Sequence, residues 1–229
     1  MSDWFEAHVA SVSPAAEGLV SVTLDVPKGV AGSHVSPGQY VKLAIEGVGE
    51  GFFAIASRAE PNEHRFEVLL KLGTALTDAV AKLERGSALR TSAALGKGFP
   101  IDRAVGKDLV LVATGSGISP VRSVIETVMA RREDFGVVSL YFGVRTPGSF
   151  AYRRSFDEWR AAKIEVYPVV SRPQDSGWTG LTGYVQSHLG GVHVPTAIAF
   201  LCGQKAMVTA VREALAGLGM PADSMYLNF

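Results

Sequence analysis

Two glycines on either side of a serine, Gly115-Ser116-Gly117, are the residues whose types and spacing best suit the binding of an anion. An apolar run at residues 109–113, typical of a strand buried on both faces, precedes them, and apolar residues at helical spacing follow from Ile118 to Met129. At such a turn, free backbone N–H groups and the helix dipole point at one place, and glycine lets a pyrophosphate approach the backbone closely. Pro120 falls in the first helical turn, where proline costs no hydrogen bond. The pattern predicts a nucleotide-binding site.

Other arrangements of reactive side chains are weaker. His188 and His193 flank a Gly-Gly pair without a carboxylate or cysteine at metal-ligand spacing, so we interpret them as solvated histidines and predict no metal site. Ser116 lies in no Gly-x-Ser-x-Gly motif and lacks a triad partner. Hydrolysis by a serine nucleophile is therefore not predicted.

The charge balance and the cysteine content exclude several classes of protein. The 22 basic and 22 acidic side chains give a formal net charge of zero, so nothing favours nucleic acid as a partner. The single cysteine, Cys202, excludes internal disulfides and any thiolate-ligated iron–sulfur cluster held by this chain alone. The N-terminus lacks the pattern of a secretory signal, and no apolar run approaches the ~20 residues of a membrane helix. We expect a soluble, cytoplasmic protein without a membrane span.

Short strands separated by turns are predicted before residue 100. Apolar and polar residues alternate, and turn signals stand at residues 13–14, 27–29 and 36–38. One helix, with Leu76 and Val80 on its apolar face, follows Gly73-Thr74, a second small-residue turn suited to a phosphate. Together these patterns predict a small antiparallel barrel. The expected strands cover residues 4–9, 19–26, 40–45, 52–57, 64–72 and 88–93.

Strands alternate with helices from Asp108 onward, which predicts an α/β domain with a parallel sheet covered on both faces. A domain boundary is expected at residues 97–100, where the pattern changes. In such sheets ligands bind beyond the carboxyl ends of the strands, where Gly115, Gly143, Ser171 and Cys202 fall. The expected strands cover residues 109–113, 137–142, 164–170, 197–202 and 225–227, and the later helices residues 150–162, 183–189 and 205–218.

The order of the motifs carries a resemblance to a known family. After the barrel come Gly115-Ser116-Gly117-Ile118-Ser119-Pro120, Tyr141-Phe142-Gly143-Val144-Arg145, Ser171-Arg172-Pro173, Trp178-Thr179-Gly180, Gly183-Tyr184-Val185 and Cys202-Gly203-Gln204-Lys205-Ala206-Met207. In this order the chain resembles the ferredoxin–NADP reductase superfamily over nearly its whole length. Gly203-Gln204-Lys205 and the ending Leu227-Asn228-Phe229 resemble its plant fruit-protein-like branch. The resemblance implies a two-domain fold, with an N-terminal antiparallel Greek-key β-barrel that binds FAD (residues 1–103) and a C-terminal α/β parallel-sheet domain that binds NAD(P)H (residues 104–229).

On the nicotinamide side, the resemblance assigns the pyrophosphate cradle to Gly115, Ser116 and Gly117, with Arg145 as a nearby donor. Ser171 and Arg172 match the place where NADP-preferring members hold the 2′-phosphate, which favours NADP, although NADH-using relatives also carry a Ser-Arg-Pro turn. Tyr184 would flank the adenine, and Cys202 with Gly203 would lie beside the nicotinamide. From the residues alone, Cys202 is a small buried hydrophobe at a strand end. The remaining predicted contacts are Thr114, Ile118, Pro120, Gly143 and Met207.

On the flavin side, Gln39, Tyr40, Gly73 and Thr74 match family positions, the last two at the flavin's phosphates. The main motif departs from the family pattern Arg-x-Tyr-Ser/Thr, because residues 51–57 are Gly-Phe-Phe-Ala-Ile-Ala-Ser. The aromatic face is kept, but the guanidinium and the hydroxyl are missing. A lost charge-assisted hydrogen bond is worth roughly 1.5–3 kcal/mol, or about ten- to a hundred-fold in affinity. The predicted flavin contacts in the motif and on the neighbouring strand are Phe53, Ala54, Ile55, Ala56, Ser57, Leu70 and Lys71, and the alternative is that Phe52, Phe53 and Ile55 are simply core residues.

Phe229, the last residue, matches the terminal aromatic that stacks on the isoalloxazine in plant-type members, and a frayed terminus is the alternative. We therefore predict an NAD(P)H-dependent flavin oxidoreductase, with FAD and NADP or NAD as cofactors and with Cys202 and Phe229 as catalytic residues. Its electron acceptor would be a ferredoxin-like protein, a quinone or a partner subunit. Two alternatives stay open: a dinucleotide-binding sensor or regulatory module that has lost FAD, and an electron-transfer subunit that works only inside a complex.

Overall fold

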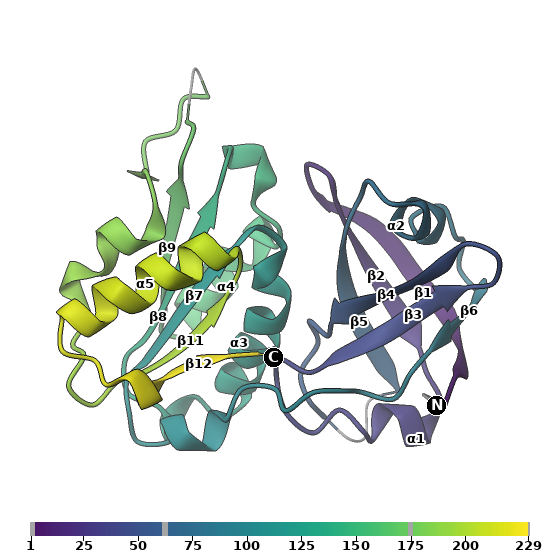
Figure 1. Ribbon diagram of the computed structural model, residues 1–229, viewed down its shortest axis with the longest axis horizontal. Helices are drawn as coiled ribbons and strands as arrows, with labels where there is room; N and C mark the ends of the chain where they lie inside the picture. Colours follow the sequence, from purple (N-terminus) through teal and green to yellow (C-terminus); the bar gives the residue numbers. More distant parts are fainter. Residues whose placement is uncertain (1–2, 61–63, 174–175, 229) are drawn as a thin grey trace.

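Two six-stranded sheets organise the chain (Figure 1). The structure, a computed structural model, describes residues 3–60, 64–173 and 176–228. The first sheet is antiparallel, in the order β4-β3-β6-β1-β2-β5, and a bridge between Ile55 and Val68 closes it into a barrel. This confirms the predicted N-terminal barrel. Its elements are β1 (Phe5–Ala16), β2 (Leu19–Asp25), α1 (Lys28–Ala31), β3 (Tyr40–Ile45), β4 (Gly49–Ala54), β5 (Arg65–Lys71), α2 (Ala75–Val80) and β6 (Ala88–Thr91).

The second sheet is parallel, in the order β10-β9-β8-β7-β11-β12, as the alternation of strands and helices predicted. Its strands are β7 (Leu109–Thr114), β8 (Val138–Val144), β9 (Ile164–Val170), β10 (Leu181–Thr182), β11 (Ile198–Cys202) and β12 (Met225–Leu227). Its helices are α3 (Ile118–Ala130), α4 (Phe156–Ala161) and α5 (Lys205–Gly217). Short 3₁₀ helices complete the chain: η1 (Ile101–Ala104), η2 (Gly115–Gly117), η3 (Arg132–Asp134), η4 (Pro147–Ser149), η5 (Arg153–Ser155), η6 (Val185–Gly191) and η7 (Ala222–Ser224).

Side chains of β7 alternate between two cores, which is why this strand is apolar throughout. Leu109 and Leu111 belong to the core that includes α3 and α4, whereas Val110 and Val112 belong to the core that includes α5 and η6. A strand buried on both faces places β7 at the centre of the sheet, between β8 and β11. The glycine turn that follows β7 is therefore held by a central strand that is buried on both faces.

The two domains share a packed interface. Leu19 and Leu69 of the barrel lie in the same buried cluster as the apolar face of α3. Phe99, in the segment that follows the barrel, stacks on Phe200 of β11 with 4.7 Å between ring centroids. The expected boundary at residues 97–100 thus falls in a segment that packs firmly on the second sheet, and the division at residue 103 remains a prediction.

Several local predictions are wrong, for physical reasons. The turn expected at Ser13-Pro14 lies inside β1, where Pro14 pairs with Val20 next to a register shift. Beyond His8, β1 pairs with β2 but not with β6, so the N–H that proline lacks is not needed there. The helix expected at residues 150–162 begins only at Phe156, because Tyr152 has a left-handed φ of 58° and a 3₁₀ turn follows it. The short helix expected at residues 183–189 is the 3₁₀ helix η6, and the expected strand 52–57 ends at Ala54.

Candidate functional site

The carboxyl ends of four parallel strands meet at one edge of the second sheet. Pairing in register aligns Cys202 of β11 with Ala113 of β7, Thr114 with Gly143 of β8, and Val144 with Val170 of β9. The order of the strands reverses direction on either side of β7, and such a point is where open α/β sheets bind ligands. The predicted nucleotide-binding residues at the strand ends are therefore brought together by the fold.

The turn at Gly115–Gly117 packs directly against the end of β11. A Cβ at Gly117 would collide with the carbonyl oxygen of Cys202 and lie 2.7 Å from its carbonyl carbon. Gly115 has a φ of 54°, and a Cβ there would meet nothing within 4 Å. One glycine thus permits contact within the protein, and the other leaves open space in front of the turn for a ligand.

Thr114, Gly203 and Met207 form a second close contact beside the turn. A Cβ at Gly203 would overlap the hydroxyl of Thr114 and lie 2.5 Å from Cε of Met207. The N–H of Gln204 donates to that threonine oxygen over 3.3 Å. Gly143 is similarly confined, since its Cβ would lie 2.8 Å from Cγ1 of Val185. The close packing of the strand ends therefore requires glycine at positions 143 and 203.

Burial controls the chemistry of Cys202. Its side chain is half-buried, and desolvation raises the pKa of the thiol to about 12. The sulfur is therefore a neutral thiol across the physiological pH range and not a thiolate nucleophile. Cys202 therefore acts as a small side chain at the end of its strand, and its main-chain carbonyl packs against the glycine turn.

Two arginines extend from neighbouring strand ends. Arg145 and Arg172 are exposed, and the N–H of Arg172 donates to the carbonyl of Arg145 over 2.8 Å. Within the described part of the chain neither guanidinium takes part in an ion pair. Ser171 bonds back to Val144 through both its N–H and its hydroxyl, and Tyr184 leaves 66% of its surface in solvent. This corner can accept a phosphate and a flat ring.

The flavin motif is more enclosed than the nucleotide turn. Phe53 packs partly into the barrel core, and a Cβ at Gly51 would lie 3.1 Å from its ring and 3.2 Å from Cδ2 of Leu76. The space beside Gly51, where the family pattern has an arginine, therefore holds Phe53 and Leu76. Phe52 points to the other side and is 63% exposed, with Lys42 5.2 Å from its ring centroid. Of Phe52, Phe53 and Ile55, the three residues that the alternative interpretation places in the core, only Ile55 is fully buried.

Several backbone N–H groups at the turn before α2 already bond to side chains of the protein. Thr74 and Thr77 form a capping box, with bonds of 3.2 Å and 3.1 Å, and the N–H of Gly73 donates to the Asp78 carboxylate over 2.9 Å. A carboxylate on this turn disfavours a second anion, because like charges repel at short range. The residues present thus fit the ring end of FAD better than its diphosphate.

The other predicted flavin contacts have structural partners. The side chain of Gln39 is buried, accepts from the N–H groups of Val35 and Ser36, and donates to the carbonyl of Gly96. Tyr40 packs edge-on against Phe52, with centroids 5.7 Å apart. The predicted contacts of these residues with FAD stay predictions, as do those of Leu70, which is fully buried, and of Lys71, which is exposed. Phe229 lies outside the described residues.

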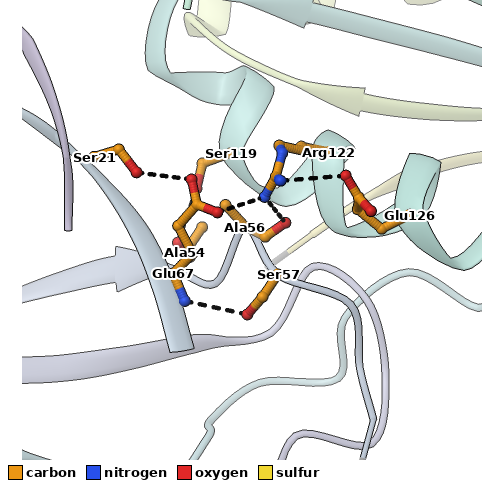
Figure 2. Close-up of polar contacts among 8 residues, drawn as sticks. All are labelled: Ser21, Ala54, Ala56, Ser57, Glu67, Ser119, Arg122 and Glu126. Carbon is orange, nitrogen blue, oxygen red and sulfur yellow. Dashed lines mark hydrogen bonds and ion pairs between the residues drawn. The ribbon is translucent and has the colours of Figure 1, made fainter. Parts of the chain in front are cut away.

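Three residues to which the sequence motifs assign no role join the two halves of the site: Ser119, Arg122 and Glu67. Ser119, in the first turn of α3, donates to the carbonyl of Ala54 over 2.9 Å (Figure 2). Arg122, one turn on, donates to the carbonyl of Ala56 and pairs with Glu67 of β5. The Ser119 contact places the end of the flavin motif next to the first turn of the nucleotide helix.

Comparison with known proteins agrees with this arrangement. Residues 111–213 match the family model of the oxidoreductase NAD-binding domain. The chain is 30% identical to the fruit protein pKIWI502 of Actinidia deliciosa, over 98% of this chain and 77% of that protein. The chain belongs to the ferredoxin–NADP reductase superfamily. This confirms the family that the motifs indicated, and it makes the chain an oxidoreductase of a flavin- and nicotinamide-binding family.

Two further proteins are similar to the chain over most of its length. The gamma subunit of sulfhydrogenase 1 from Pyrococcus furiosus is 29% identical, over 84% of this chain and 67% of that protein. A ferredoxin NADP+ reductase from Neisseria gonorrhoeae, solved with bound FAD and NADP, matches with a TM-score of 0.81 and 21% identity, over 100% of both chains. The latter shows that the whole chain shares the fold of that reductase.

Two kinds of feature are absent from the described residues, a membrane-spanning helix and a cluster of metal-ligating side chains. In the ranges 3–60, 64–173 and 176–228, no helix has the length and apolar character to span a membrane. The same ranges contain no group of three or more His, Cys, Asp or Glu side chains placed to hold a metal ion.

Gly117→Ala is expected to weaken nucleotide binding at least about tenfold, because the new methyl group must push the turn away from the Cys202 carbonyl. Calorimetric titration with NAD+ and NADP+ measures the effect. Gly217→Ala is the matched control, since a Cβ at that position meets nothing within 4 Å. Equal affinities in wild type and Gly117→Ala would show that the turn does not touch the nucleotide.

Cys202 is expected to resist alkylation by iodoacetamide at pH 8, because a pKa of about 12 leaves almost no thiolate there. The rate should rise as the pH approaches 12, where the raised pKa finally allows the proton to leave. Mass spectrometry of the intact protein follows the reaction, and the unfolded chain in denaturant is the control. Rapid alkylation of the folded protein at pH 8 would contradict the burial of this thiol.

Proposed function

We propose that this protein transfers reducing equivalents from NADPH or NADH through FAD to a separate electron acceptor. The observation that carries the proposal is the bond from Ser119 to the carbonyl of Ala54, which joins the nucleotide helix to the end of the flavin motif. Two cofactor rings held on either side of this contact would face each other. Such positioning turns a bimolecular hydride transfer into an effectively unimolecular step. A cytoplasmic location and domains at residues 1–103 and 104–229 are part of the proposal.

The residues of the chain act by binding and orientation. Gly115, Ser116 and Gly117 would hold the pyrophosphate of the nicotinamide nucleotide at the start of α3, with Arg145 beside it. Cys202 and Gly203 would limit the depth to which the nicotinamide enters. The carbonyl of Cys202 lies against the glycine turn, and Gly203 lies against Thr114. Phe53 and the segment 54–57 would support the flavin, and Phe229 would cover it. FAD, when bound, supplies the two-electron chemistry that side chains lack.

A second candidate function is a nucleotide-binding sensor without FAD. Phe53 and Leu76 fill the space beside Gly51, and Asp78 holds the N–H of Gly73 at the predicted phosphate turn. Both features would lower the affinity for the diphosphate of FAD. The third candidate, an electron-transfer subunit, is supported by the similarity to a protein that is itself a subunit of a sulfhydrogenase. In that case a partner protein would receive the electrons.

The visible spectrum of the purified chain, before and after addition of FAD, decides between the first two functions. We expect FAD to bind with a flavin absorbance band, and NADPH or NADH to bleach this band under anaerobic conditions. A chain that binds NADP+ or NAD+ but takes up no FAD would replace the oxidoreductase by the sensor. Co-elution of the chain with a partner, together with reduction of ferricyanide by the isolated chain, would favour the subunit.

Arg172→Ala is expected to weaken NADPH binding by about ten- to a hundred-fold and to leave NADH binding unchanged, because the lost guanidinium would bond only to the 2′-phosphate. Titration with each nucleotide measures the two affinities. Arg160→Ala is the matched control, because Arg160 pairs with Asp157 on α4. An equal loss for both nucleotides would mean that Arg172 does not recognise the 2′-phosphate.

A further inference from the structure

Arg122 contacts four groups, and two of them, the carboxylate of Glu67 and the carbonyl of Ala56, belong to the barrel (Figure 2). Its Nη1 donates to the carboxylate of Glu67 on β5 over 2.8 Å and to the carbonyl of Ala56 over 3.2 Å. Its Nη2 lies 3.2 Å from Oε1 of Glu126, one turn further along α3. The guanidinium carbon lies 4.7 Å from the centroid of the Tyr152 ring. A planar guanidinium can satisfy all these partners at once, whereas an ammonium cannot.

The contacts are sheltered from solvent. The side chains of Arg122 and Glu67 expose 17% and 19% of their surface. An ion pair at this depth is screened less than a pair on the surface, so its geometry is held more firmly. Tyr152, beneath the guanidinium, is also mostly buried, and its desolvation raises the pKa of its hydroxyl. The arginine therefore has few alternative positions.

Glu67 transmits the contact to the flavin motif. Its carboxylate accepts from the hydroxyl of Ser21 over 2.7 Å, which fixes the end that Arg122 binds. Its main chain accepts from the N–H of Ala56 over 2.7 Å and donates to the hydroxyl of Ser57 over 3.2 Å. Residues 56 and 57 are thus tied to the same residue whose side chain Arg122 holds.

Helix α3 donates two hydrogen bonds to the flavin motif. Ser119 donates to the carbonyl of Ala54, and Arg122 donates to the carbonyl of Ala56. Residues three positions apart lie on one face of a helix, so one face of α3 carries both donors. Ser119 follows the glycine turn by two residues. The separation between the nucleotide turn and the segment 54–57 is therefore fixed by these two side chains.

We infer that Arg122 is a positioning residue for hydride transfer, acting through Glu67 and the Ala56 carbonyl. The inference rests on the proposed function. Arg122 lies outside the nucleotide turn and leaves nucleotide affinity unchanged, but it sets the approach of the nicotinamide to the flavin. A displacement of about 1 Å costs about a hundredfold in the rate of such a step. Arg122 therefore acts on the rate of flavin reduction and not on nucleotide binding.

The test compares Arg122→Ala, Arg122→Lys and Glu67→Gln with the control Arg160→Ala, each in the full chain loaded with FAD. Anaerobic mixing with NADH or NADPH gives the rate of flavin reduction, and titration with NAD+ and NADP+ gives the affinity. We expect Arg122→Ala to slow reduction by about ten- to a hundred-fold, with unchanged affinity and unchanged reoxidation by ferricyanide. Arg122→Lys should keep part of the wild-type rate of flavin reduction, and the control Arg160→Ala should keep all of it. Reduction of Arg122→Ala at the wild-type rate, or a loss confined to nucleotide affinity, would overturn the inference.

Hydrogen exchange of the same proteins without cofactors gives a second readout. The Ala56 amide should exchange about tenfold faster or more in Arg122→Ala than in wild type or Arg160→Ala, since one support of the segment is lost. Unchanged exchange would overturn the inference. If Arg122→Ala does not fold, Glu67→Gln keeps the shape of the side chain and carries the same expectations. A wild-type protein that no nicotinamide nucleotide reduces would instead show that the proposed function is wrong.

Discussion

The contact between Gly117 and the carbonyl of Cys202 is the constraint on which the site depends. A glycine at position 117 lets the turn after β7 lie on the end of β11, where any side chain at that position would collide with the carbonyl. That placement directs the first turn of α3 toward the barrel, where Ser119 reaches Ala54. The helix that reaches the barrel thus starts from a turn whose close packing requires glycine at position 117.

The two halves of the site are built differently. The nucleotide half consists of small residues that permit close contacts and of exposed arginines, so the backbone and the solvent-facing charges would do the binding. The flavin half has lost the charged and hydroxyl groups of the family pattern and keeps an aromatic side chain, Phe53, which packs on the barrel. The barrel offers few side chains that could bind the flavin phosphates directly, but it is firmly attached to α3 through Glu67. The residues of the barrel therefore determine its position relative to the second domain more strongly than they determine the binding of the flavin phosphates.

The sequence predicts those parts of the fold that follow from local patterns. The apolar run of β7 and the glycine turn after it are visible in adjacent residues, and the structure confirms both elements. The ion pair of Arg122 and Glu67 is not visible in this way, because the partners are 55 positions apart and each lies on an otherwise ordinary helix or strand. The capping box of Thr74 and Thr77 is hidden in the sequence for a different reason: a phosphate and a threonine side chain satisfy the same N–H groups. Sequence patterns identify free donors, but not which group of the protein already occupies them.

Pro14 has a consequence for the behaviour of the protein in a crowded solution. The outer half of β1 pairs with β2 alone, so its other edge would offer a row of backbone groups to a strand from another molecule. A proline within that edge removes one donor, and the register shift beside it bends the strand. Ala15 and Ala16 then pack against the core of the second domain. The residue that resembles a turn signal in the sequence thus makes this edge a poorer template for a strand from another molecule.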